Sequence, residues 1–187
     1  MKRPSFFIAL CFFPLACKVA GSNHHKNPMR SVYLHQKSYY QTKISNKNDY
    51  ISIVNVGRSF REKLYLSNGI KVADLQNYLI LEGFNPGWGT YRGLLISNQG
   101  SYTYSSMETG WNMKAIEADN EEISRATGID RIIIDKVRMW DTAYINQHNH
   151  RLGEHVSDGS VFMATRVQYI DHLHSKIETI AFYEFVR

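Results

Sequence analysis

Imidazole and carboxylate side chains gather between residues 148 and 155, where they have the chemistry to bind a metal ion. His148 and His150 are two residues apart, so both rings project from one face if this stretch is a strand. Glu154 and His155 follow closely, and zinc and copper accept ligands of both kinds. One hypothesis is therefore a metal-binding protein or a metal-dependent enzyme that uses these four residues.

The same segment also fits a solvated surface loop. Gly153 and the pair Asp158-Gly159 are typical turn residues. The His-Glu-x-x-His motif of metalloprotease helices is absent from the sequence. His172 and His174 repeat the two-residue spacing, but in a predicted turn. We therefore expect the chain to bind no metal or other cofactor.

Aromatic residues between positions 88 and 111 form the second candidate site. Tyrosine and tryptophan combine a flat apolar surface with a hydrogen-bonding edge, which suits a sugar ring or a protein partner. The predicted ligand-binding residues are Trp88, Tyr91, Arg92, Tyr102, Tyr104 and Trp111. The alternative is that these rings pack in the core, as aromatic residues in strands generally do.

Motifs of covalent and nucleotide chemistry are absent. The sequence has no Gly-x-Ser-x-Gly elbow and no phosphate-binding loop, and the glycines of residues 87–93 miss the dinucleotide-binding spacing. Both cysteines, Cys11 and Cys17, lie near the N-terminus, so the remainder has no thiol nucleophile or thiolate zinc site. A hydrolase whose two catalytic carboxylates are distant in sequence remains an alternative. The pattern favours a protein that binds rather than catalyses.

The N-terminus has the composition of a bacterial export signal. Lys2 and Arg3 precede an apolar run over residues 6–13, which is too short to span a bilayer. The segment Leu15-Ala16-Cys17 then resembles the end of a bacterial lipobox, which implies that Cys17 is lipidated and becomes the new N-terminus. Cleavage near the small residues 20–22 is the alternative and would release a soluble exported protein.

Charge divides the rest of the chain into two parts. Residues 18–48 contain six cations and no acid, and their polar composition predicts a flexible basic tether. Its cations have the sign to lie against anionic lipid headgroups. Residues 49–187 contain 14 basic and 17 acidic residues, a net charge of −3, so we expect no nucleic-acid binding. The expected organisation is a lipoprotein-like secretion signal over 1–17, the tether, and one globular domain over 49–187.

Local patterns predict that this domain is α+β. We expect strands over residues 50–56, 91–97, 101–106, 161–170 and 176–186. We expect helices over residues 71–82 and 119–127, the second with capping residues at both ends. Residues 131–148 fit either a helix or a long strand, and their β-branched content favours the strand.

These elements predict a mostly antiparallel sheet of five to seven strands that ends in a C-terminal β-meander. About two helices would cover one face and leave the other free to bind. The leading hypothesis is an exported, periplasmic or outer-membrane-anchored lipoprotein. It would be held to the membrane by an N-terminal lipid, and its small non-enzymatic domain would bind an envelope protein or a glycan.

Overall fold

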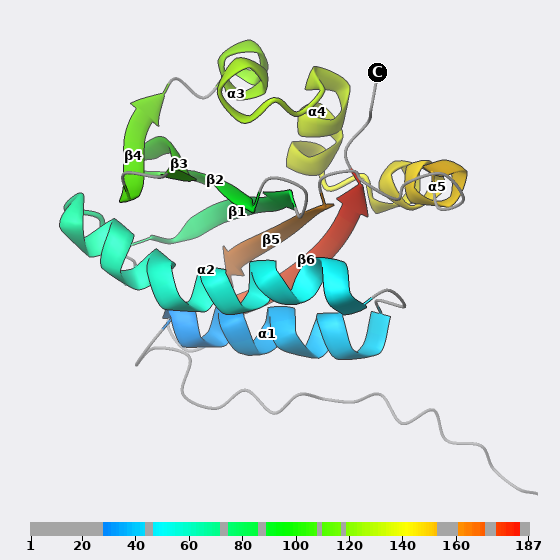
Figure 1. Cartoon of the computed structure of the whole chain (residues 1–187), viewed down its shortest axis with the longest axis horizontal. Helices are drawn as coiled ribbons and strands as arrows, with labels where there is room; N and C mark the ends of the chain where they lie inside the picture. The colour runs from blue at the N-terminus through cyan, green and yellow to red at the C-terminus, as the bar shows by residue number, and fades with distance from the viewer. Residues whose placement is uncertain are drawn as a thin grey trace, which may run out of the picture.

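The computed structural model describes residues 28–43, 47–71, 75–85, 89–107, 110–116, 119–152, 161–170 and 175–183 (Figure 1). Along the chain the elements are α1 (Pro28–Lys43), α2 (Lys47–Ser67), β1 (Asn77–Asn85), β2 (Thr90–Ser97), β3 (Gly100–Met107), β4 (Gly110–Ile116), α3 (Asn120–Thr127), α4 (Arg131–Met139), α5 (Thr142–Leu152), β5 (Val161–Tyr169) and β6 (Ser175–Tyr183). The predicted secretion signal over residues 1–17, which includes Cys17, lies outside the described residues. Within these residues, no helix combines the length and the apolar character needed to cross a membrane.

The six strands form one antiparallel sheet in the order β4-β3-β2-β1-β5-β6. Helices cover both faces of this sheet: α1 and α2 pack on one, and α3 and α4 lie over the other, with α5 beside β6 (Figure 1). Neighbouring residues on the central strand β1 therefore belong to different cores. Ile80 faces α2, and Leu81 packs with the residues of α3 and α4. The α+β class and the antiparallel sheet are confirmed. The described helices cover both faces of the sheet, so the expectation that one face is free of helices is wrong.

Two predicted elements with strong local signals are confirmed. The hairpin over residues 91–106 forms as β2 and β3, in which Ser97 pairs with Gly100 across a two-residue turn. Helix α3 begins after Asp119, whose carboxylate accepts hydrogen bonds from the backbone N–H groups of Glu121 and Glu122 at 2.8 Å. The helix ends at Gly128, in the left-handed conformation with φ of 75°. The predicted strand over 161–170 forms as β5, and the predicted strand over 176–186 forms as β6 as far as Tyr183, while its last three residues lie outside the described part.

The prediction of a flexible tether is wrong for residues 28–43, which form α1 and belong to the folded domain. Val32 and Gln36 are both fully buried, one helical turn apart. The Tyr39 hydroxyl accepts a hydrogen bond from the Ala181 backbone N–H of β6 at 3.3 Å. The inward face of α1 is thus partly polar, and for this reason its apolar periodicity is weak in the sequence.

The predicted strand over residues 50–56 is part of α2, and the predicted helix over residues 71–82 overlaps β1. In α2 the buried positions, which include Ile53 and Tyr65, recur at helical spacing over 21 residues, a longer pattern than the β-branched run at its start. In β1 the apolar run at residues 78–81 is buried on both sides of the sheet, as expected of a central strand.

Residues 131–148 form two helices rather than the long strand that we expected. Ile133, Ile134 and Val137 are buried on one face of α4. Asp130 caps its start, because the carboxylate accepts a hydrogen bond from the Ile132 N–H at 2.8 Å. Trp140 ends the helix with a left-handed φ of 58°, and α5 follows directly. Packing against the sheet outweighs the β propensity of the isoleucines here.

Candidate functional site

A buried ion pair joins α2 to the central strand of the sheet. The Arg61 side chain is 1% exposed and the Glu82 side chain 0%. The Nε and Nη2 atoms of Arg61 donate to the two carboxylate oxygens of Glu82. Gln36 of α1 completes the arrangement, because its Oε1 accepts from Arg61 Nη2 at 2.6 Å and its Nε2 donates to Thr165 at 3.0 Å. One polar cluster therefore connects both helices of this layer to the sheet.

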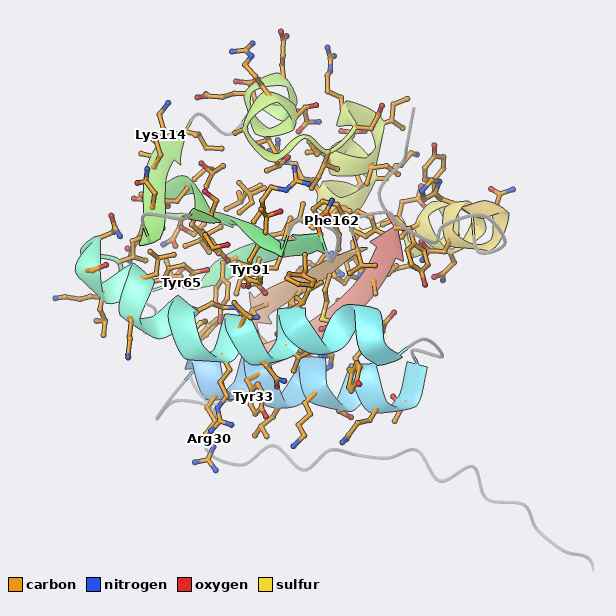
Figure 2. All side chains as sticks on the ribbon, in the orientation of Figure 1. Arg30, Tyr33, Tyr65, Tyr91, Lys114 and Phe162 are labelled. Atoms are coloured by element: carbon orange, nitrogen blue, oxygen red, sulfur yellow. The ribbon has the colours of Figure 1, made fainter. Side chains whose placement is uncertain are left out.

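Tyrosine hydroxyls surround this ion pair. The Tyr104 hydroxyl donates to Glu82 Oε1 at 3.0 Å and lies 3.1 Å from the Tyr65 hydroxyl. Tyr65 and Tyr91 lie between α2 and the sheet (Figure 2). Burial, and then the charge of Glu82, raises the pKa of the phenols of Tyr65, Tyr91 and Tyr104, so these groups stay protonated and neutral. The cluster holds the fold together from within and offers no access to a ligand.

The predicted aromatic binding face is mostly part of this core. Tyr91 and Tyr104 are buried, and the half-buried Tyr102 donates to the Gln99 carbonyl oxygen at 3.1 Å. Gly93 pairs with Tyr104, and a Cβ at this glycine would lie 1.9 Å from the Tyr104 ring. The ring thus packs across the glycine rather than facing a ligand. Arg92 points to the opposite face of the sheet.

The two predicted tryptophans are less informative. Trp88 lies outside the described residues. Trp111 of β4 pairs with Ser106 of β3, and the side chain of Trp111 lies outside the described part.

The predicted metal site rests on a strand that the structure replaces with α5. His148 and His150 belong to this helix, and the side chain of His150 lies outside the described part. His148 is buried at the contact with β6, and its Nε2 lies 3.4 Å from the Tyr183 carbonyl oxygen. Glu154 and His155 lie outside the described residues, as do His172 and His174. No group of three histidine, cysteine or acidic side chains within the described ranges could hold a metal ion.

A hollow lies between α3 and strands β2, β3 and β4, on the face opposite α1 and α2. Its volume is about 730 Å³. We call it the β2–β4 hollow, and the sheet lines it with Thr90, Arg92, Thr103, Ser105, Asn112 and Lys114. Ala126 and Thr127 line it from the end of α3. Of the predicted ligand-binding residues, Arg92 and Tyr104 contribute to its wall.

The strand register places the polar residues of the hollow side by side. Arg92 pairs with Ser105, and Ser105 pairs with Asn112 on the next strand. One step along the same face, Thr103 pairs with Lys114 on the edge strand β4. Lys114 lies on the side of the sheet that α3 covers (Figure 2). The lining thus combines two cations with hydroxyl and amide groups.

The sequence contains a signal for this site that motif searches do not detect. Alternate residues of the three strands are polar, in the pairs Thr90 and Arg92, Thr103 and Ser105, and Asn112 and Lys114. Such alternation is typical of a sheet with one polar face. The pairs form one surface only when the three strands are aligned in register.

Comparison of the chain with models of known protein families, with curated proteins and with solved structures finds no match. The chemistry of the lining side chains therefore carries the functional assignment.

Proposed function

We propose that this chain is an exported, non-enzymatic binding protein whose domain holds a glycan in the β2–β4 hollow. The observation that carries this proposal is the hollow itself, with a volume of about 730 Å³. Sites for small ligands span roughly 300–1,000 Å³. The hydroxyl groups of Thr103 and Ser105 and the amide of Asn112 both donate and accept hydrogen bonds, as sugar hydroxyls do. The concave shape favours a glycan over the flat surface of a protein partner.

The lining also supports binding rather than catalysis. Among the described residues that line the hollow there is no aspartate, glutamate, histidine or cysteine. These are the groups that most often act as general acid, general base or activated nucleophile. The serine and threonine hydroxyls of the hollow thus have no adjacent base among these residues.

The filling variant Ser105→Tyr tests the glycan proposal. Ser105 lies in the middle of the polar row, so a tyrosine there occupies the hollow without changing its charge. On an array of envelope glycans, wild-type protein should bind a subset that Ser105→Tyr does not bind. The control is Ser38→Tyr, at an exposed position of α1 on the other face of the domain. Undiminished binding by a folded Ser105→Tyr variant would place the ligand elsewhere.

Anchoring at the membrane is the second part of the proposal and rests on the leader. Arg30 and Lys37 are exposed on α1, the first described helix after the leader, and α1 contains no acidic residue. Their charge suits contact with anionic headgroups, at roughly 1 kcal/mol for each cation near such a surface. Helix α1 lies on the face of the sheet opposite α3 (Figure 1), and the end of α3 lines the hollow. This orientation therefore turns the hollow away from the bilayer.

Palmitate labelling in a bacterial host tests the anchor. Wild-type protein should incorporate radiolabelled palmitate and fractionate with membranes, and Cys17→Ser should do neither, because the acylated thiol is removed. Cys11→Ser is the matched control, since it changes the other cysteine of the leader and should be labelled normally. Equal labelling of wild type and Cys17→Ser, or none in wild type, rejects lipidation at this residue.

A further inference from the structure

We propose that the β2–β4 hollow selects an acidic saccharide, whose carboxylate or phosphate group lies between Arg92 and Lys114. This inference rests on the proposed glycan-binding function and specifies its ligand class. It follows from the charge balance of the hollow, from the placement of its two cations, and from the contacts that orient Arg92.

The charge balance of the hollow is positive. Arg92 and Lys114 contribute to its lining, and β2, β3 and β4 contain no aspartate or glutamate between Thr90 and Ser97, Gly100 and Met107, or Gly110 and Ile116. Two acids at the start of α3 have partners within that helix. Asp119 accepts from backbone N–H groups, and Glu121 lies 3.3 Å from Arg125. An anionic ligand would therefore meet attraction without an opposing carboxylate among the described lining residues.

The two cations are spaced to hold one group between them. Arg92 and Lys114 are two strands and two residues apart in the register. Strands lie about 4.8 Å apart and rise about 3.4 Å per residue. Two long side chains on the same face can bridge this separation between the backbone positions of Arg92 and Lys114, because each extends toward the other from its own strand. Ser105 and Thr103 lie on the strand between them, where their hydroxyls can donate to the same anion or to a neighbouring sugar hydroxyl.

Contacts inside the domain orient the Arg92 guanidinium. Its Nη1 donates to the Thr127 carbonyl oxygen at 2.6 Å, at the C-terminal end of α3. The negative end of a helix dipole favours a cation at this position. The guanidinium carbon also lies 5.8 Å from the centre of the Phe162 ring. A planar guanidinium held in this way matches the geometry of a carboxylate or phosphate, so part of the ordering entropy is lost on folding rather than on binding.

Titration of the full chain with glucuronate, glucose and inorganic phosphate, followed by NMR chemical shifts, tests this inference. Wild-type protein should bind glucuronate about tenfold or more tightly than glucose, because only glucuronate carries a charge for the two cations. Added salt should weaken glucuronate binding and leave glucose binding unchanged. Inorganic phosphate should also shift the resonances of β2–β4 residues, because an anion without a sugar ring is sufficient to contact both cations.

Two variants separate charge recognition from the rest of the site. Arg92→Gln/Lys114→Gln should lose the preference for glucuronate and retain glucose binding. Lys114→Gln alone should lose part of the preference, and it covers the case in which loss of the Arg92 contact to Thr127 disturbs folding, because Lys114 is exposed on an edge strand. The control is Lys37→Gln, which removes an exposed lysine of α1 and should bind as wild type does.

The outcomes distinguish this inference from the function on which it rests. Equal affinity for glucose and glucuronate, unchanged in the double variant, overturns the selection of an anion and leaves glycan binding intact. If neither saccharide nor phosphate shifts the residues of the hollow, the glycan-binding proposal fails as well.

Discussion

Replacing Glu82 with glutamine is expected to lower the free energy of unfolding by about 3–5 kcal/mol, the range observed when one partner of a buried ion pair is removed. Glutamine has nearly the shape of glutamate, so the change creates no cavity. It leaves the Arg61 guanidinium, 1% exposed, without its counter-charge. Burial alone lowers the pKa of Arg61, but the charge of Glu82 raises it above its usual value, so the folded protein depends on the pair as a unit.

Urea unfolding at neutral pH measures this loss, with Glu121→Gln as the control. Glu121 also faces an arginine, at 3.3 Å, but the Arg125 and Glu121 side chains are 73% and 67% exposed. Exposed pairs contribute about 0–1 kcal/mol, so the control should remain near wild type. Similar losses in the two variants would show that the Arg61–Glu82 pair is solvated in the folded protein.

The apolar replacement Arg61→Met/Glu82→Leu distinguishes the value of the pair from the penalty of breaking it. Both charges leave together, so no uncompensated charge remains in the core. The Tyr104 hydroxyl keeps its Tyr65 partner, and Gln36 keeps its bond to Thr165. We expect the double variant to lose less stability than Glu82→Gln. A loss of stability equal to the sum of the losses in Arg61→Met and Glu82→Leu would indicate independent contributions rather than a coupled pair.

The parts of the fold that could be predicted from sequence are those in which neighbouring residues determine the structure. Asp119 and Gly128 mark the ends of α3 by their own chemistry, and the short turn before Gly100 aligns β2 with β3. Helices α1 and α2 depend instead on residues that are distant in sequence. Arg61 and Gln36 appear polar in the sequence, yet both are buried because Glu82, far along the chain, pairs with them. No local window contains that information.

The candidate site shows the same limit. The residue type of Tyr104 predicts a ligand-binding side chain, but its pairing with Gly93 places the ring in the core, because the glycine has no side chain to keep the ring away. The sequence indicates Arg92 as a binding residue by the aromatic residues near it, whereas its partners in the hollow, Ser105 and Lys114, come from other strands. Strand pairing, rather than residue type, determines which polar side chains share a surface.

Gly57→Ala is expected to destabilise the protein by about 2–4 kcal/mol, although alanine favours a helix by about 0.8–1 kcal/mol over glycine. Gly57 lies one turn before Arg61 in α2, and a Cβ there would lie 2.1 Å from Arg61 Nη2 and 2.7 Å from Cζ. The guanidinium cannot retreat without leaving Glu82 and Gln36. Overpacking alone costs roughly 1–3 kcal/mol, and the disturbed ion pair adds to it.

The sign of this effect should reverse when Arg61→Met/Glu82→Leu is the parent protein. Methionine places no atom where Arg61 has Cζ and Nη2, and its flexible terminal methyl group, which reaches only about as far as Nε at 3.1 Å, can turn away from the alanine methyl group, so the helix propensity of alanine should stabilise the protein by up to about 1 kcal/mol. Urea unfolding of the four proteins in this cycle measures the coupling, and Lys63→Ala, at an exposed position of the same helix, should change both parents by about 0.5 kcal/mol or less. An equal loss from Gly57→Ala in both parents would show that the glycine serves the helix backbone. A reversal would show that it is present to make room for the buried arginine.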